Sequence, residues 1–178
     1  PTLAAPTLPD ESQQLAQPAA AAARRPRASR TAAVLADAWP AVVAALLKST
    51  ALNAAFPFFT YAPSSGQLGD ALPQALFYGR IFADIAGRFL PRFLPRRLGS
   101  PRPAGLLLAA AALASGAALF IAYVASAPPR LVSDAASVAA VAALWLLGGY
   151  CNTAANVMAP GLVRRPALAP RASALMAL

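Results

Sequence analysis

The sequence has 178 residues, of which 58% are hydrophobic and only 12% are charged, with a formal net charge of +9 and no histidine. Soluble domains carry about twice this share of charge, so the composition favours a membrane protein. The basic residues lie in short clusters between apolar runs, which argues against nucleic-acid binding. Because Cys151 is the only cysteine, a disulfide framework and a metal site built from cysteine or histidine are excluded, and we expect no cofactor.

Residues 1–32 are rich in Pro, Ala, Gln and Ser and end in the basic run RRPRASR. This composition is typical of a disordered, solvated segment, and we interpret it as a basic cytoplasmic segment. It does not resemble a secretory signal, because its charges follow the alanine run instead of preceding it. Residues 33–178 are expected to form a transmembrane domain.

The first expected span covers residues 39–61, which matches the roughly 20 residues that cross a bilayer. Trp39 and Tyr61 stand at its ends, where aromatic residues lie at the membrane interface. Lys48 lies about 13 Å inside this span if it is helical. Its ammonium group must either reach back to the interface or face a wet cavity.

The second expected span, residues 71–91, contains the stretch PQALFYGRIFADIAGR. Arg80, Asp84 and Arg88 follow one another at intervals of four residues, so on a helix they drift by only about 40° per step and share one face. The rest of this helix is apolar. A narrow charged stripe on an apolar helix is expected to face a cavity or other helices inside a membrane.

The third and fourth expected spans cover residues 104–127 and 135–158. The third carries no charge and is dense in Ala, Gly and Ser, which is typical of a closely packed scaffold helix. Asn152 and Asn156 lie four residues apart near the end of the fourth, on one face, where they either bond to other helices or line a cavity. A fifth span is expected to start at residue 172.

The distribution of basic residues predicts the orientation. Loops on the side of the N-terminus hold most of the arginines, whereas the opposite loops hold Arg130 together with Asp70 and Asp134. The positive-inside rule places the arginine-rich side in the cytoplasm. The arginines on that side are Arg24, Arg25, Arg27, Arg30, Arg92, Arg96, Arg97, Arg102, Arg164, Arg165 and Arg171. An integral, multi-pass protein of the plasma membrane or an organelle membrane is therefore predicted.

Several different short motifs follow one another in a distinctive order along residues 33–178. In the second span, Pro73 is followed by Asp84 and then by Gly87 and Arg88. The first span ends in FPFFT, the fourth contains GGY followed by a proline and a basic pair, and the chain ends in ASALMAL. In order and spacing these motifs resemble helices seven to ten, and the start of helix eleven, of the equilibrative nucleoside transporter family.

The resemblance implies the C-terminal half of an all-α, polytopic transmembrane bundle of the major-facilitator-like kind. It implies transport of nucleosides or similar polar aromatic solutes by alternating access, with Asp84 and Arg88 contacting the nucleoside in a central cavity. The implied partners are a nucleoside or nucleobase-like small molecule, the lipid bilayer and the N-terminal half of the same transporter. The sequence departs from the family at Arg80, Ile81, Ile85 and Gly148, where the family has an aromatic residue, Asn, Trp and Asn.

The candidate substrate-binding residues are Asp84, Arg88, Arg80, Lys48, Asn152 and Asn156. The extra cations Lys48 and Arg80 also leave open a transporter of an anionic solute. Related branches of the superfamily, whose layout is similar in part, leave open a riboflavin-like solute. A non-transporting membrane scaffold, with Asp84 neutralised by Arg80 or Arg88, is the alternative from another class. An enzyme is not expected, because one aspartate with only arginines for partners makes a poor acid–base pair.

Overall fold

The computed structural model describes residues 27–93, 102–126 and 132–176 of the protein. Within these ranges every regular element is a helix and no strand occurs, which confirms the predicted all-α class. The chain falls into two compact units, Pro1–Ala33 and Val34–Leu178. Of the first unit, only residues 27–33 are described, and they are helical. The helical bundle belongs to the second unit.

The first long helix, α2 (Arg27–Ala55), begins inside the segment that we expected to be disordered. Residues 27–32 are helical instead, because the alanine-rich run that follows Arg30 has high helix propensity and no glycine. The rest of that segment, residues 1–26, lies outside the described residues. Beyond Ala55 the chain tightens into the 3₁₀ helix η1 (Phe56–Tyr61), where Pro57 has no N–H to continue the α-helical hydrogen bonds.

The second and third expected spans are helices with nearly the predicted bounds. After the short 3₁₀ helix η2 (Gly69–Ala71), α3 covers Leu72–Phe93, and α5 covers Pro103–Ser126. Pro73 lies in the first turn of α3, where backbone N–H groups have no acceptor within the helix, so proline is tolerated there. Pro103 opens α5 for the same reason.

The fourth expected span is α6 (Asp134–Leu162), which begins after Ser133. The Ser133 side chain accepts a hydrogen bond from the backbone N–H of Ala136, and Asp134 adds a negative charge to the first turn, so both residues favour a helix start here. The 3₁₀ helix η4 (Pro166–Leu168) and the short helix α7 (Ala169–Met176) follow. The fifth helix thus begins slightly before residue 172.

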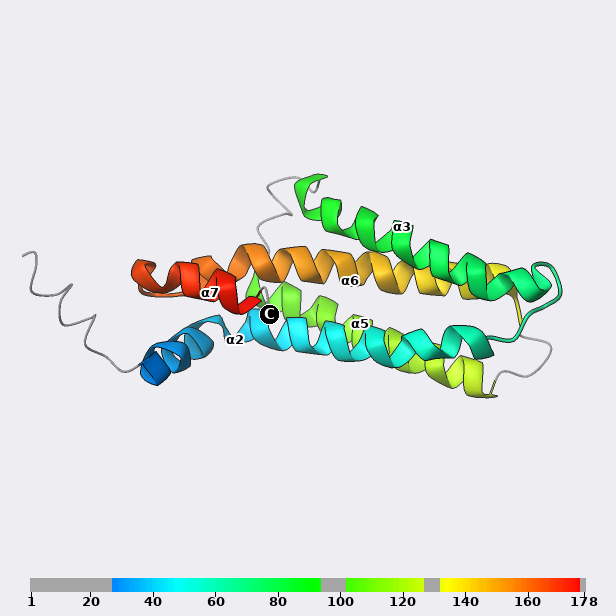
Figure 1. Ribbon diagram of the computed structural model, residues 1–178, viewed down its shortest axis with the longest axis horizontal. Helices are drawn as coiled ribbons and strands as arrows, with labels where there is room; N and C mark the ends of the chain where they lie inside the picture. The colour runs from blue at the N-terminus through cyan, green and yellow to red at the C-terminus, as the bar shows by residue number, and fades with distance from the viewer. Residues whose placement is uncertain (1–26, 94–101, 127–131, 177–178) are drawn as a thin grey trace, which may run out of the picture. The chain divides into compact units, whose positions relative to one another are not determined.

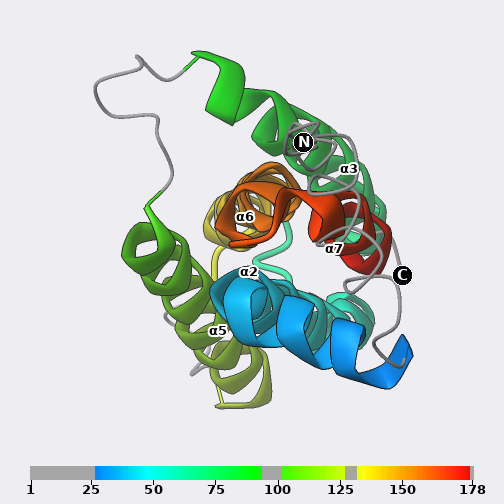
Figure 2. The ribbon, with the colours of Figure 1, turned by 90° about the vertical axis from the view of Figure 1, so that its left-hand side faces the viewer.

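Helix α6 lies in the middle of the bundle, with α3 on one side and α2 and α5 on the other (Figure 1; Figure 2). Its buried side chains include Trp145, whose ring meets Phe59 of η1 at a centroid distance of 5.1 Å in an edge-to-face arrangement. Phe59 also contacts Phe120 of α5 at 6.1 Å. These three rings join η1, α5 and α6 in one apolar core.

Two glycines bring α3 and α6 into backbone contact. A Cβ on Gly87 would overlap the carbonyl oxygen of Leu146, and a Cβ on Gly149 would overlap the carbonyl oxygen of Asp84. Each helix therefore contributes one glycine to the same interface. Only glycine allows such close approach, and small residues at helix contacts are typical of membrane bundles.

At each end of the bundle an aspartate accepts hydrogen bonds from another segment of the chain. At one end the buried Asp134 accepts hydrogen bonds from Ser64 Oγ at 3.0 Å and from the backbone N–H groups of Ser65 and Leu68 at 2.6 Å. At the other end Asp37 of α2 accepts from the backbone N–H of Arg164 at 3.1 Å. Loop 62–68 thus lies beside the start of α6, and α2 beside its end, as the predicted alternation of loops requires.

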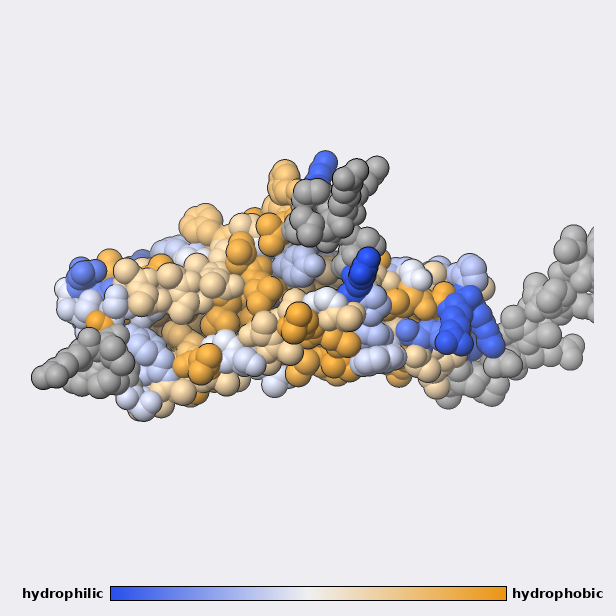
Figure 3. Space-filling model, turned by 180° about the vertical axis from the view of Figure 1, so that it is seen from behind, coloured by the Kyte–Doolittle hydropathy of each residue, from blue (hydrophilic) through white to orange (hydrophobic). Residues whose placement is uncertain are grey.

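Among the residues that the structure describes, three helical segments are long and apolar enough to cross a membrane: Arg30–Tyr61, Pro103–Ser126 and Asp134–Leu162. Helix α3 is not among them because Arg80, Asp84 and Arg88 lie within two turns of its middle. Large apolar side chains remain exposed on several helices, and hydrophobic residues predominate over the middle of the face seen in Figure 3. The fold is therefore compatible with a membrane protein, and the membrane crossing of α3 stays a prediction.

Candidate functional site

A cavity of about 570 Å³ opens between α2, α3 and α6. Charged residues and aromatic rings share its wall. The lining residues are Lys48, Ser49, Leu52, Asn53, Phe56, Phe77, Arg80, Ile81, Asp84, Ile85, Arg88 and Trp145. Four of the six predicted substrate-binding residues therefore meet at one cavity, and the charged stripe of α3 faces it along its length.

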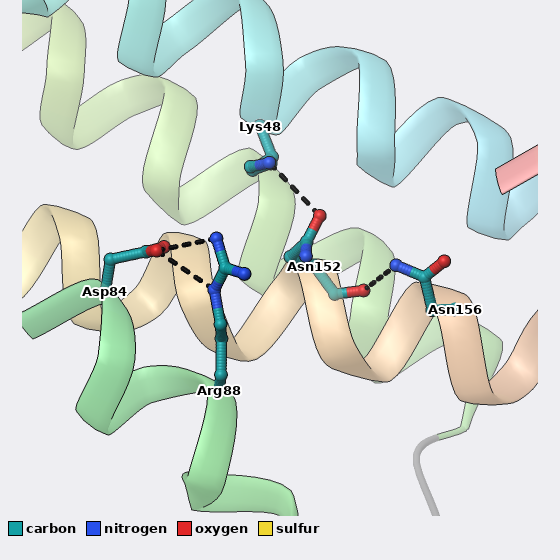
Figure 4. Close-up of polar contacts among 5 residues, drawn as sticks. All are labelled: Lys48, Asp84, Arg88, Asn152 and Asn156. Atoms are coloured by element: carbon teal, nitrogen blue, oxygen red, sulfur yellow. Dashed lines mark hydrogen bonds and ion pairs between the residues drawn. The ribbon is translucent and has the colours of Figure 1, made fainter. Parts of the chain in front are cut away.

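Asp84 and Arg88 form an ion pair one helical turn apart (Figure 4). Arg88 Nη2 lies 2.7 Å and Arg88 Nε 3.0 Å from the same carboxylate oxygen, Oδ2 of Asp84. The Asp84 side chain is 23% exposed and that of Arg88 55% exposed, so the pair sits in the cavity wall and not in the core. Both contacts are to Oδ2, so Oδ1 of Asp84 keeps the capacity to accept a hydrogen bond from a solute hydroxyl.

Arg80 contacts aromatic rings instead of a carboxylate. Its guanidinium carbon lies 4.4 Å from the ring centroid of Phe56, 5.5 Å from that of Phe77 and 5.8 Å from that of Trp145. Cation–π attraction holds a guanidinium over a ring at such distances and leaves its charge uncancelled. Of the two arginines considered as partners of Asp84, the structure pairs only Arg88 with it.

Lys48 projects from α2 toward α6, where its Nζ donates a hydrogen bond of 3.1 Å to Oδ1 of Asn152 (Figure 4). Its side chain lines the first cavity and also a second one, of about 590 Å³, between α2, α6 and α7. Of the two orientations considered for Lys48, the structure therefore has the ammonium facing cavities and not reaching back to the end of the helix.

The two asparagines of α6 belong to the second cavity and not to the first. Asn152 combines the two roles that were left open, because it lines a cavity and also bonds to another helix. Asn156 lines the same cavity, and its Nδ2 donates to the backbone carbonyl of Asn152 within α6 at 2.8 Å. The six predicted residues thus form two groups, and Lys48 belongs to both.

Sequence reasoning missed the aromatic wall and part of the polar wall of the first cavity. Ser49 and Asn53 of α2 line it at a spacing of four residues, beside Phe56. Their spacing was the signal, because polar residues that interrupt an apolar helix on one face mark a polar surface. Thr50 interrupts the same span but lines a different groove, between α2 and α5. Trp145 carries no such signal, since aromatic residues are common in any core.

No protein-family model, curated protein or solved structure matches this sequence. In the part of the chain that the structure describes, no group of three or more His, Cys, Asp or Glu residues could hold a metal ion. Function must therefore be inferred from the cavity itself and from the sequence resemblance.

Proposed function

We propose that this chain forms the C-terminal half of a multi-pass membrane transporter that moves nucleosides or similar polar aromatic solutes by alternating access. One observation carries the proposal: a charged stripe on α3 faces a cavity inside a bundle whose other helices are mostly apolar. Charges in such surroundings are expensive to bury and typically line a solute pathway. The resemblance to the equilibrative nucleoside transporters is the reason for proposing nucleosides or similar solutes as the substrate class.

The cavity wall offers the groups that a nucleoside needs. Oδ1 of Asp84 is positioned to accept a hydrogen bond from a ribose hydroxyl, while Arg88 holds Oδ2 and fixes the carboxylate in place. Phe56, Phe77 and Trp145 provide ring surfaces on which a flat base could stack. Inside a cavity partly shielded from water, these polar contacts are stronger than at a protein surface.

In this proposal α3 crosses the membrane with its charges turned toward the cavity and its apolar side toward lipid. Phe82 supports that arrangement, because it is 70% exposed and is not among the cavity residues. The opposite wall of the cavity would come from the N-terminal half of a major-facilitator-like bundle. Opening and closing of the cavity would then follow from rocking of one half against the other.

A membrane scaffold is the second candidate, and the Asp84–Arg88 ion pair is the observation that favours it. A carboxylate already neutralised by an arginine one turn away can serve structure alone. The partial exposure of both side chains weighs against this, because exposed pairs of this kind stabilise a protein by only about 0–1 kcal/mol.

Uptake of labelled nucleosides by cells that express the complete transporter tests the proposal. We expect saturable uptake that unlabelled nucleosides inhibit, and we expect Asp84→Asn to abolish it while surface expression is kept. Asp70→Asn is the matched control, because Asp70 lies exposed in η2 and outside both cavities. Normal surface expression without uptake of any polar aromatic solute would favour the scaffold.

A further inference from the structure

We infer that the solute accepted by the first cavity carries an oxyanion, a carboxylate or a phosphate, which binds between Lys48 and Arg80. The inference rests on the proposed function and narrows its substrate class from polar aromatic solutes to aromatic anions. The charge of the cavity wall, the pairing of its charges and the position of Arg80 each support it.

The wall of the first cavity is strongly positive. Lys48, Arg80 and Arg88 contribute three positive charges, whereas Asp84 contributes the one negative charge among the described lining residues. Two positive charges are left without a counter-charge. In a cavity with apolar surroundings, such charges raise the affinity for a negatively charged solute well above that for a neutral one.

The pairing of these residues shows which two cations are free to bind an anion. Asp84 is engaged by Arg88, with both contacts on a single carboxylate oxygen. Lys48 donates to the neutral amide of Asn152, and Arg80 rests on aromatic rings. In the described parts of the chain, neither Lys48 nor Arg80 forms an ion pair with a carboxylate.

Arg80 is held in a way that suits anion recognition. The guanidinium carbon lies 4.4 Å from the centroid of the Phe56 ring, and a guanidinium that rests on a ring keeps the N–H donors at its edge for other partners. A fixed guanidinium edge matches the two oxygens of a carboxylate or phosphate. The neighbouring rings of Phe77 and Trp145 would meet the aromatic part of the same solute.

The test measures equilibrium binding to the complete transporter, purified and placed in lipid nanodiscs. Three labelled probes are compared: a nucleoside, the corresponding 5′-monophosphate and an aromatic monocarboxylate. We expect at least one of the two anions to bind more tightly than the nucleoside, and the comparison between them distinguishes phosphate from carboxylate. This comparison uses the unaltered protein and so does not depend on any variant folding.

Variants then locate the anion. Lys48→Met and Arg80→Met should each weaken anion binding roughly ten- to a hundredfold, which corresponds to loss of one charged hydrogen-bond donor, and should weaken nucleoside binding by a much smaller factor. Lys48→Arg, which keeps the charge, should retain most of the affinity. Arg92→Met is the matched control, because Arg92 is an exposed cation of α3 outside the cavity, and its removal should have no effect.

The outcomes separate this inference from the proposed function. Nucleoside binding that is as tight as, or tighter than, the binding of both anions would overturn the inference. The charges of Lys48 and Arg80 would then have to be neutralised by a carboxylate from the other half of the transporter. Equal loss of anion affinity in Arg92→Met and Lys48→Met would also overturn it. Tight anion binding without uptake of any solute would support the anion site and contradict the proposed transport function.

Discussion

Gly149 of α6 lies directly against the backbone of Asp84 in α3, so that a Cβ on Gly149 would overlap the Asp84 carbonyl oxygen. The residue that places a carboxylate in the cavity is therefore also one of the residues through which the two helices are in backbone contact. The position of the carboxylate depends on this contact, because any change that separates the helices moves Asp84 relative to Lys48 and Trp145 on the facing walls.

Gly149→Ala is expected to destabilise the protein by about 1–3 kcal/mol, the typical effect of adding a methyl group to a fully packed contact. The added Cβ meets backbone atoms, which cannot rotate away as a side chain could. Thermal denaturation of the purified protein, followed by size-exclusion chromatography, measures the effect.

Gly105→Ala in the first turn of α5 serves as the control, since a Cβ there would meet nothing within 4 Å. Alanine has the higher helix propensity, so this variant should be as stable as the parent or slightly more stable. If Gly149→Ala behaves like Gly105→Ala, the two helices do not have the close contact described.

Asp84→Asn is expected to leave the folded state nearly as stable as the parent, with a loss of about 0–1 kcal/mol, because the ion pair with Arg88 is partly exposed. Uptake should nevertheless fall sharply, since asparagine replaces one acceptor oxygen by a donor. Surface expression and uptake, measured in parallel, separate the two effects.

The double variant Asp84→Asn with Arg88→Met removes both members of the pair. If the pair is purely structural, the single variant should misfold and the double variant should recover both expression and uptake. Recovery of uptake would contradict the proposed role of Asp84 toward the solute.

Asp134→Asn is expected to lower the midpoint of thermal denaturation clearly. The backbone N–H groups of Ser65 and Leu68 bind different oxygens of the Asp134 carboxylate. An asparagine must therefore direct its NH₂ group at one of these donors, and that hydrogen bond is lost. Asp70→Asn, in the exposed η2 of the same region, should have almost no effect. Equal midpoints for the two variants would show that the Asp134 contacts do not hold loop 62–68.

Cysteine labelling is expected to report the orientation. The native Cys151 is buried, so the parent protein should react little with a membrane-impermeant maleimide. Gln67→Cys should react in intact cells that carry the complete transporter at their surface, whereas Ala167→Cys should react only after permeabilisation; both positions are exposed. The reverse pattern would place the arginine-rich loops outside the cell and invert the predicted topology.

The helices and the charged stripe could be predicted because both depend on local periodicity. Apolar runs of about 20 residues specify α2, α5 and α6, and the four-residue spacing of Arg80, Asp84 and Arg88 puts them on one face of a helix. Spacing does not say which neighbour each side chain meets. Arg80 therefore contacts aromatic rings from two other elements, although its sequence position suggested Asp84 as readily.

The contacts between distant segments could not be predicted. Asp134 binds residues that lie 66–70 positions earlier in the chain, and Lys48 bonds to a residue 104 positions later. A helical wheel gives the direction of a side chain but not the vertical register of two helices. Gly87 and Gly149 set that register for α3 and α6. The register depends on how the two helix surfaces fit together, and the sequence of one helix alone does not predict this fit.

Lys48 and its neighbour Ser49 line both cavities, and beyond them the two lining sets have no residue in common. Lys48 thus lies at the border of two cavities of nearly equal volume, with its flexible side chain held by one hydrogen bond to Asn152. Rotation about its carbon–carbon bonds would move the ammonium group from one cavity toward the other. Truncation in Lys48→Ala should merge them into one continuous chamber, visible in an experimental structure of that variant.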